Sequence, residues 1–447
     1  MPSAGSDKFP PGPPPALRGG LYGRMQKSPL EFFMEVAKDY GDVAGLRLMK
    51  FRTIFINHPD FIEDVLVNHA RKFHKGRVLK ANKRLFGEGL LTSEGNFWLR
   101  QRRLAQPAFH RVRIAAYAET MVRYAERAMK DWRSGDTRDI HEEMMQLTLQ
   151  VVGKTLFDAD VAGDAREVGR TLDVLMRLGA NFGRSILVPL WLPTPRNIRA
   201  TLGIRRLEKI IFRIISERRE SGRDAGDLLS MMLAAQDEDG SRMTDQQLRD
   251  ESITIFLAGH ETTANLLSWT WRLLAQNPAV EKKLHEELDG ILGGRAPGLE
   301  DLPRLEYMNN LLTESLRLYP PAWGMARLTI EEHEIAGYPL HPGMGVAFVQ
   351  WVVHRDLRWY DAPEEFRPER WADGLAKRIP RFAYFPFGGG PRQCIGNTFA
   401  LMEASLILAT IAQRFQFRLI PGHQVTPLAS ITLRPRNGIR VTLQSRK

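Results

Sequence analysis

The sequence is poor in cysteine: its 447 residues include only one, Cys394. A lone cysteine cannot form an internal disulfide, and it cannot by itself build a zinc or iron–sulfur site. It must therefore serve either as a small buried side chain or as a single thiolate ligand. One cysteine also fits a reducing compartment, so we expect the protein to be cytoplasmic.

Long apolar runs are missing as well. No stretch of eighteen or more apolar residues occurs, so no transmembrane helix is expected. The first fifteen residues are polar and proline-rich, and they lack the basic start and the apolar stretch of a signal peptide. The composition is 43% hydrophobic and 26% charged, which allows a large core beneath a soluble surface.

Acidic residues are outnumbered by basic ones, 52 to 63, which gives a net charge of +11. A basic balance can indicate nucleic acid, an anionic membrane or an acidic protein as partner. No nucleic-acid motif of basic residues interleaved with aromatic ones is present, so we expect no nucleic-acid binding. The densest basic cluster allows two interpretations, a solvated face without a partner or a surface that binds an acidic protein. This cluster comprises Lys80, Lys83, Arg84, Arg100, Arg102, Arg103, Arg111 and Arg113.

The order of helix and strand signals predicts a mainly α fold with small β-sheets, of the α+β class. Residues 94–278 show almost wholly helical patterns, whereas strand signals occur at 53–56, 329–353 and 416–443. No internal repeat and no linker composition is found. We expect an extended Pro-rich segment over 1–15, outside the packed core, and one large domain over 16–447.

The clearest predicted helix spans residues 244–277. Thr244 and Gln247 form a capping-box start, and Asn277 before a proline marks the end. At 1.5 Å per residue this helix would be roughly 50 Å long. It would therefore cross the whole molecule.

The middle of this helix carries residues that are locally unfavourable there. Gly259 costs about 1 kcal/mol relative to alanine, and Glu261 and Thr262 are polar residues in an apolar stretch. This pattern indicates a function, although a threonine hydroxyl bonded to a carbonyl one turn earlier is an alternative. The zinc-protease motif His-Glu-x-x-His is excluded, because Ala264 stands where the second histidine would be.

The surroundings of Cys394 suit a thiolate ligand. Glycines precede it, Arg392 lies two residues before it, and helix-forming residues 397–414 follow it. Helix N-termini and cations lower the pKa of a thiol, and glycines let backbone N–H groups approach the sulfur. A phosphate-binding loop is excluded, because the glycines match neither of the nucleotide-binding patterns.

Residues 387–396 resemble the haem-binding loop of the cytochrome P450s, Phe-x-x-Gly-x-Arg-x-Cys-x-Gly. Every specified place is filled, by Phe387, Gly390, Arg392, Cys394 and Gly396. The resemblance implies a cytochrome P450-type fold with a long central helix over the haem. It also implies haem b (iron protoporphyrin IX) as cofactor, with Cys394 as the ligand of the iron.

The middle of the long helix resembles the family pattern Ala/Gly-Gly-x-Asp/Glu-Thr. The matching residues are Ala258, Gly259, Glu261 and Thr262. The resemblance implies that Gly259 leaves room for dioxygen, that Thr262 hydrogen-bonds the reacting oxygen and that Glu261 relays protons. Glu261 and Thr262 are therefore the expected catalytic residues.

A further match is the pair Glu314 and Arg317, whose spacing lets them meet on one helix face. Downstream, Arg370 lies in a segment similar to the family's Pro-Glu-Arg-Phe, with Trp371 in place of phenylalanine. The resemblance implies a buried structural network of Glu314, Arg317 and Arg370. We expect the tryptophan to be tolerated at a packing position.

Partners for the haem propionates are implied by the same resemblance. Trp98 and Arg102 match the family's Trp-x-x-x-Arg, and Arg327 and Arg392 are further cations near the matched segments. Together with Phe387 and Gly396 of the loop, they are the expected cofactor-binding residues.

Substrate-pocket candidates are chosen by position and are apolar or small, which suits a fatty acid, terpenoid or steroid-like molecule. Ordinary core packing is the alternative for each. The apolar run 185–193 could form an entrance lip, a membrane contact or a buried connection. Residues 97–103 resemble the fatty-acid-hydroxylating branches. The pocket candidates are Phe86, Leu90, Phe256, Ala258, Gly259, Ala322, Trp323, Met325 and Ile431.

The resemblance implies a haem-thiolate monooxygenase of the soluble, bacterial type, because no apolar anchor precedes the Pro-rich start. It would insert one oxygen atom from O₂ into an apolar small molecule. We expect a monomer that receives electrons from a separate ferredoxin or flavodoxin with its reductase, since no such domain follows. The alternatives are a peroxygenase or hydroperoxide isomerase with the same haem, and a non-catalytic haem-binding sensor or carrier.

Overall fold

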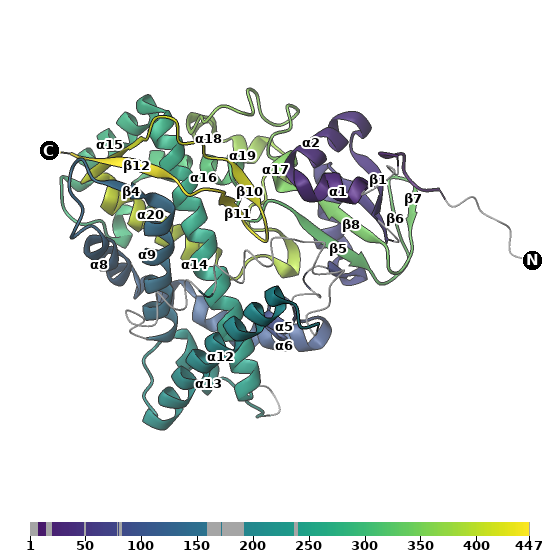
Figure 1. Cartoon of the computed structure of the whole chain (residues 1–447), viewed down its shortest axis with the longest axis horizontal. Coiled ribbons are helices and arrows are strands. Elements are labelled where there is room, and N and C mark those ends of the chain that lie inside the picture. The colour runs from purple at the N-terminus through teal and green to yellow at the C-terminus, as the bar shows by residue number, and fades with distance from the viewer. Residues whose placement is uncertain are drawn as a thin grey trace, which may run out of the picture.

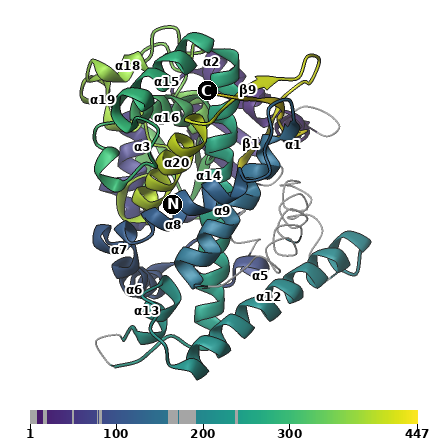
Figure 2. The same ribbon diagram turned by 90° about the vertical axis from the view of Figure 1, so that its left-hand side faces the viewer.

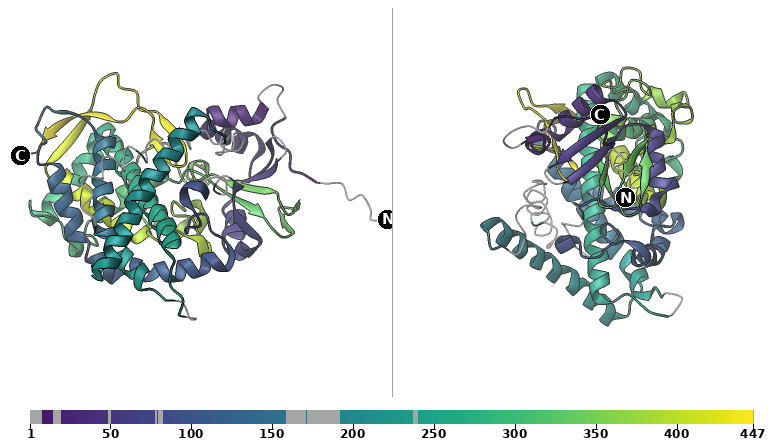
Figure 3. Two further views of the ribbon diagram at one scale, coloured as in Figure 1. Left: turned by 60° about the horizontal axis from the view of Figure 1, so that its bottom comes forward. Right: turned by 90° about the vertical axis from the view of Figure 1, so that its right-hand side faces the viewer.

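The computed structural model describes residues 8–14, 20–48, 51–77, 79, 83–158, 171, 192–236 and 240–446. Helices fill one side of the molecule and a five-stranded sheet lies at the other (Figure 1). The purple and green strands of this sheet lie at one end of the molecule, beyond the teal helices (Figure 3). This arrangement is the mainly helical α+β fold that the sequence predicted.

The long central helix is α14 (Asp245–Gln276), with Thr244 as N-cap and a complete capping box to Gln247. Its 32 residues span about 48 Å. Nearly every side chain from Leu248 to Leu274 is buried, because other helices surround it. It packs against α9 (Ile140–Phe157), α12 (Pro195–Ser221), α16 (Glu306–Leu318) and α20 (Asn397–Ala412). Figure 2 shows α14 running along most of the molecule with α9 beside it.

The other described α-helices are shorter, and most of them bury one apolar face. They are α1 (Gly20–Lys27), α2 (Pro29–Tyr40), α3 (Pro59–Glu63), α5 (Lys83–Phe86), α6 (Gly95–Ala105), α7 (Arg111–Ala115), α8 (Ala118–Ala128), α13 (Leu228–Ala234), α15 (Pro278–Leu292), α17 (Gln350–Val353), α18 (Glu369–Ala372) and α19 (Leu375–Arg378).

The largest sheet has the strand order β1-β2-β8-β5-β3. Its strands β2 and β8 are parallel, and its other neighbours are antiparallel. The strands are β1 (Val43–Leu48), β2 (Phe51–Ile56), β3 (Phe73–Lys75), β5 (Met325–Thr329) and β8 (Gly345–Phe348).

Three smaller sheets complete the described strands. They are β4 (Thr137–Asp139) with β12 (Arg440–Ser445) and β9 (Phe415–Leu419), the hairpin of β6 (His333–Ile335) and β7 (Tyr338–Leu340), and the hairpin of β10 (Pro427–Ala429) and β11 (Leu433–Pro435).

The described part of the Pro-rich segment, residues 8–14, forms neither helix nor strand. It packs on β1 nevertheless, unlike the separate lead-in that we expected. The backbone N–H of Gly45 donates to the carbonyl of Pro11, and the ring of Phe9 lies against the core beneath the sheet. Arg52 covers the same ring, with its guanidinium carbon 4.8 Å from the centroid. The close contact arises because two glycines, Gly12 and Gly45, let the backbones approach.

The largest core cluster surrounds α14, and two smaller clusters lie on the faces of the five-stranded sheet. Over the described ranges, none of the helices combines the length and the apolar character that a bilayer crossing requires.

Candidate functional site

The loop that carries Cys394 is closed by its own backbone. The N–H of Cys394 donates to the carbonyl of Phe387 over 3.0 Å, and α20 begins three residues later at Asn397. Gly390 has a φ of 66°, and a Cβ there would lie 1.8 Å from the carbonyl oxygen of Leu66. No other residue fits this position, since both the backbone conformation and the close approach require glycine. The loop therefore holds the cysteine against the start of α20.

Cys394 is exposed to solvent, although many protein atoms surround its thiol. Burial raises the pKa of its thiol, whereas the N–H of Gly396 and the charges of Arg102 and Lys75 lower it. Coordination to a metal ion deprotonates a thiol outright. The surrounding N–H group and cations would then stabilise the resulting thiolate.

Positive charge is concentrated beside this loop. Arg102 donates to the carbonyl of Gln393 over 2.9 Å. The guanidinium of Arg392 stacks 3.8 Å from the ring centroid of Trp98 and pairs with Glu94. The loop is thus tied to α6 through both arginines.

Lys75 is a member of this cluster that the sequence analysis missed. It lies directly opposite Arg327 in the register of β3 and β5. Burial, followed by the charges of Arg327 and Arg392, lowers the pKa of Lys75 to about 7. Burial likewise lowers the pKa of both Arg327 and Arg392 to about 10. No sequence signal pointed to Lys75, because its strand has only three residues.

This cluster fits a cofactor that carries carboxylates. Like charges directly opposite each other on neighbouring strands are unfavourable. Among the described residues, Lys75, Arg327 and Arg392 share the carboxylate of Glu94, and the charge of Arg102 acts on Arg392 as well. Two propionate groups would supply the missing negative charge beside the cysteine.

On α14, an otherwise buried helix, Ala258 is exposed and Gly259 and Thr262 are partly exposed. The hydroxyl of Thr262 donates to the carbonyl of Ala258 over 2.6 Å, the local bond that the sequence analysis left open as an alternative. A Cβ on Gly259 would lie 3.2 Å from a methyl carbon of Val152 on α9. The glycine therefore also permits the close packing of α9 on α14.

Glu261 is buried and engaged in an ion pair. Its Oε1 accepts from Nε of Arg434 over 2.6 Å and from the hydroxyl of Thr432. The amide of Asn265 donates to the same hydroxyl. Sequence reasoning found neither partner, since both lie about 170 residues away on and beside β11. Glu261 thus joins α14 to β11.

Glu314, Arg317 and Arg370 lie together in the interior. Arg317 binds both carboxylate oxygens of Glu314 over 2.9 Å, and Nε of Arg370 donates to Oε1 over 2.8 Å. Trp371 does more than pack, because its indole N–H donates to Oε2 over 2.8 Å. Burial raises the pKa of this carboxyl, but the hydrogen bond and charge of Arg317, with the charge of Arg370, bring it below its usual range.

The pocket candidates fall into two groups. Phe86 and Phe256 are buried in the large core, where the ring of Phe256 lies 5.2 Å from that of Phe157. Leu90 is partly buried, and its N–H donates to Glu251 on α14. These three side chains come from α14 and from the segment that enters α6.

The second group approaches the loop between β10 and β11. Trp323 donates its indole N–H to the carbonyl of Ser430 over 2.8 Å, next to Ile431. Ala322, Trp323 and Met325 are all partly exposed. Their segment therefore offers an accessible apolar surface.

Some predicted residues lie outside the described part of the chain. They are Lys80, the side chains of Arg84 and Arg111, and the apolar run 185–193 up to residue 191.

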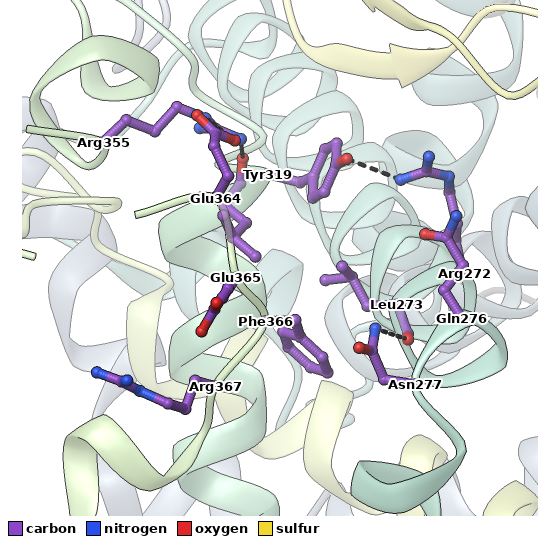
Figure 4. Close-up of a pocket in the computed structure, with 11 residues that line it drawn as sticks. Arg272, Leu273, Gln276, Asn277, Tyr319, Arg355, Glu364, Glu365, Phe366 and Arg367 are labelled. Atoms are coloured by element: carbon purple, nitrogen blue, oxygen red, sulfur yellow. Dashed lines mark hydrogen bonds and ion pairs between the residues drawn. The ribbon is translucent and has the colours of Figure 1, made fainter. Parts of the chain in front are cut away.

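A separate polar pocket of about 400 Å³ lies where α14 ends (Figure 4). Arg272 donates to the hydroxyl of Tyr319 across it, and Arg355 pairs with Glu364. It contains none of the predicted site residues and is not a candidate for the functional site.

Known proteins resemble this chain over nearly its whole length. The family model described as cytochrome P450 matches residues 10–442. Cyclooctatin synthase of Streptomyces melanosporofaciens is 41% identical, over 92% of this chain and 90% of the relative. Cyclooctat-9-en-7-ol 5-monooxygenase of the same organism is 38% identical, over 89% and 87%. Pentalenene oxygenase of Streptomyces avermitilis is 34% identical, over 95% and 94%. The chain therefore belongs to the cytochrome P450 family and is an oxidoreductase that carries out monooxygenation of apolar small molecules.

Proposed function

We propose that this monooxygenase oxidises a terpenoid, with haem b as its cofactor. The relatives are named for cyclooctatin, cyclooctat-9-en-7-ol and pentalenene, which are terpenoid compounds. They align over nearly the whole chain. Among the three substrate classes that the sequence left open, these names favour the terpenoid over the fatty acid and the steroid.

When bound, the haem supplies the iron at which dioxygen reacts. Cys394 would provide a thiolate ligand to its iron, and Arg102, Arg327 and Arg392 with Lys75 would bind the propionates. The observation that carries this assignment is the excess of cations beside the lone accessible cysteine. Trp98 would orient Arg392 through their stacked contact.

Thr262 would deliver a proton through its hydroxyl, which is partly exposed on α14. Because this hydroxyl now donates to the carbonyl of Ala258, it would rotate to reach a different acceptor. Glu261 would have to exchange its bond to Arg434 before it could relay a proton. A proton relay through Glu261 would therefore depend on the side chain of Glu261 or of Arg434 turning away from the other.

Electrons would come from a ferredoxin or a flavodoxin with its reductase, acting on a cytoplasmic monomer. Such carriers are acidic, and the elements beside the cysteine loop carry exposed Arg113 and the basic residues of α6. Exposed apolar side chains accompany this charge. They are Leu99 on α6, Val112 on α7 and Leu401 on α20.

The haem assignment is tested on the reduced, carbon-monoxide-treated protein. Wild type should show the red-shifted absorption of a thiolate-bound haem, and Cys394→His should bind haem without that absorption. A wild-type spectrum without the shift would overturn the assignment.

The substrate class is tested by titration with cyclic terpenes and with fatty acids of equal carbon number, in which the spin state of the iron reports binding. Terpenes should bind at lower concentrations, and preference for the fatty acids would reject the terpenoid proposal alone.

A further inference from the structure

A cluster of metal-binding side chains lies apart from the cysteine loop. It consists of Asp64, which opens a π-helical turn (Asp64–Asn68), His69, which follows that turn, and His333 of β6. Their potential ligand atoms all lie within 4.8 Å of one another. Two segments about 265 residues apart in sequence therefore bring together one carboxylate and two imidazoles.

Asp64 lies between the two histidines. Its Oδ1 is 2.6 Å from Nδ1 of His69, and its Oδ2 is 2.6 Å from Nε2 of His333. The imidazole rings are 4.7 Å apart between centroids. Each histidine thus directs one nitrogen toward the same carboxylate, and at this distance that nitrogen donates its N–H to Asp64. An ion bound here would replace these two protons, because a histidine binds metal through a deprotonated nitrogen.

The backbone and packing hold these groups in place. The N–H of His69 donates to the carbonyl of Asp64 over 2.8 Å, which closes the turn between them. The side chain of His333 is only 7% exposed, and the edge of its ring meets Phe73 at 5.4 Å. The side chain of His69 is 45% exposed. The buried His333 fixes one side of the cluster, and the exposed His69 leaves the other side open to solvent, from which an ion could enter.

We propose that Asp64, His69 and His333 bind one divalent transition-metal ion of the Zn²⁺ class. Two imidazoles and a carboxylate are a donor set that Zn²⁺ uses, with water in the fourth position. Metal–ligand bonds of about 2.1 Å place neighbouring ligand atoms roughly 3.4 Å apart in a tetrahedron. The present separations of 2.6 Å would have to widen by less than about 1 Å, which rotation of the side chains of His69 and Asp64, 45% and 25% exposed, can supply.

Such an ion would cross-link the π-helical turn to the β6–β7 hairpin. The turn contacts the cysteine loop, because the carbonyl of Leu66 faces Gly390. Binding would therefore stabilise a segment that supports the haem loop, although the ion itself lies outside the haem site. A plain hydrogen-bonded cluster, in which both histidines donate to Asp64, is the competing arrangement and predicts no stoichiometric ion.

Calorimetric titration of untagged, chelator-treated, haem-loaded protein with zinc chloride separates the two arrangements. We expect one ion per chain, and a weakening of about tenfold or more in both His69→Ala and Asp64→Asn. The matched control is His341→Ala, because His341 is also an exposed histidine paired with a carboxylate, that of Glu332, but does not belong to the cluster of Asp64, His69 and His333. Its binding should equal that of wild type.

Thermal unfolding gives a second measurement. Zinc should raise the Tm of wild type and of His341→Ala but not that of His69→Ala, since a ligand stabilises only the state that binds it. The carbon-monoxide spectrum of each variant verifies that the haem loop is intact. Three results would overturn the proposal: no stoichiometric binding by wild type, unchanged binding in both site variants, or an equal loss in His341→Ala.

Discussion

At the scale of single residues, Thr262 connects the helix geometry with the chemistry. Its hydroxyl bonds to the carbonyl of Ala258, which is an ordinary arrangement for a threonine within a helix. What sets it apart is exposure in the middle of an otherwise buried helix. Thr263 and Thr270 make similar bonds to carbonyls but are buried.

We expect Thr262→Ala to lower the product formed per electron consumed by about tenfold or more, with the lost electrons appearing as hydrogen peroxide. General acid–base groups typically contribute roughly 10²–10⁴-fold to a rate, and alanine has no hydroxyl to donate. Parallel assays of product, peroxide and cofactor consumption measure this ratio. Thr262→Ser should retain most of it, and Thr270→Ala should leave it unchanged. A constant ratio in Thr262→Ala would favour a peroxygenase or isomerase.

Glu403 on α20 is a buried acid outside the predicted site. Burial raises the pKa of its carboxyl well above the usual value, and among the described residues neither carboxylate oxygen has a hydrogen-bond partner. The native state therefore keeps this proton at pH values where the unfolded chain has lost it. Its contribution to stability is fully present below the unfolded pKa of about 4.5 and is lost as the pH rises toward the folded pKa.

Glu403→Gln should remove this pH dependence. Relative to the variant, wild type should lose up to about 1.4 kcal/mol of unfolding free energy per pH unit within that window. Denaturant unfolding between pH 5 and 8 measures the difference. Glu331→Gln, at an exposed carboxyl, is the control and should follow wild type. Parallel curves for wild type and Glu403→Gln would show that this proton is not retained on folding.

At the scale of elements, the sequence predicted the features that depend on interactions between residues close together in the chain. The ends of α14 followed from Thr244, Gln247 and Asn277, because capping bonds span three or four residues. The ion pair of Glu261 with Arg434 could not be foreseen, since it depends on how β11 lies against α14. Lys75 was missed for the same reason, because its role depends on Arg327, which lies opposite it on the neighbouring strand.

The contact between α16 and α18 gives a prediction at this scale. Trp371 donates its indole N–H to the buried carboxylate of Glu314. Trp371→Phe keeps an aromatic ring but removes that donor, so it should lower the unfolding free energy by about 1.5–3 kcal/mol, the usual contribution of a hydrogen bond to a charged group.

Denaturant unfolding of the haem-loaded protein would measure this loss. Trp359→Phe is the matched control, because among the described residues its indole nitrogen has no hydrogen-bond partner. A loss in Trp371→Phe no larger than that in the control would mean that the arginines satisfy Glu314 without the indole.

At the scale of the whole molecule, the class of fold was predictable and its long-range pairing was not. The strand signals near 53–56 and 329–353 were recognised, but not that β2 and β8 pair in parallel with Thr53 opposite Gly345. Nothing in either segment encodes its partner almost 300 residues away. The expectation of the overall architecture came from the resemblance to the family, because members of one family share a fold and with it the pairing of the strands.

The distribution of charge gives the last prediction. Arg103 on α6 and Arg113 on α7 are exposed on elements beside the cysteine loop, so Arg103→Glu should slow reduction by an acidic ferredoxin at low ionic strength. The effect should shrink as salt rises, because the Debye length falls from about 30 Å at 0.01 M to about 3 Å at 1 M. Stopped-flow reduction under carbon monoxide measures the rate. Lys38→Glu makes the same change in net charge on α2, beside the five-stranded sheet, where the side chain is exposed. If both variants slow equally, overall charge rather than this surface directs the encounter, and the proposed docking face is wrong.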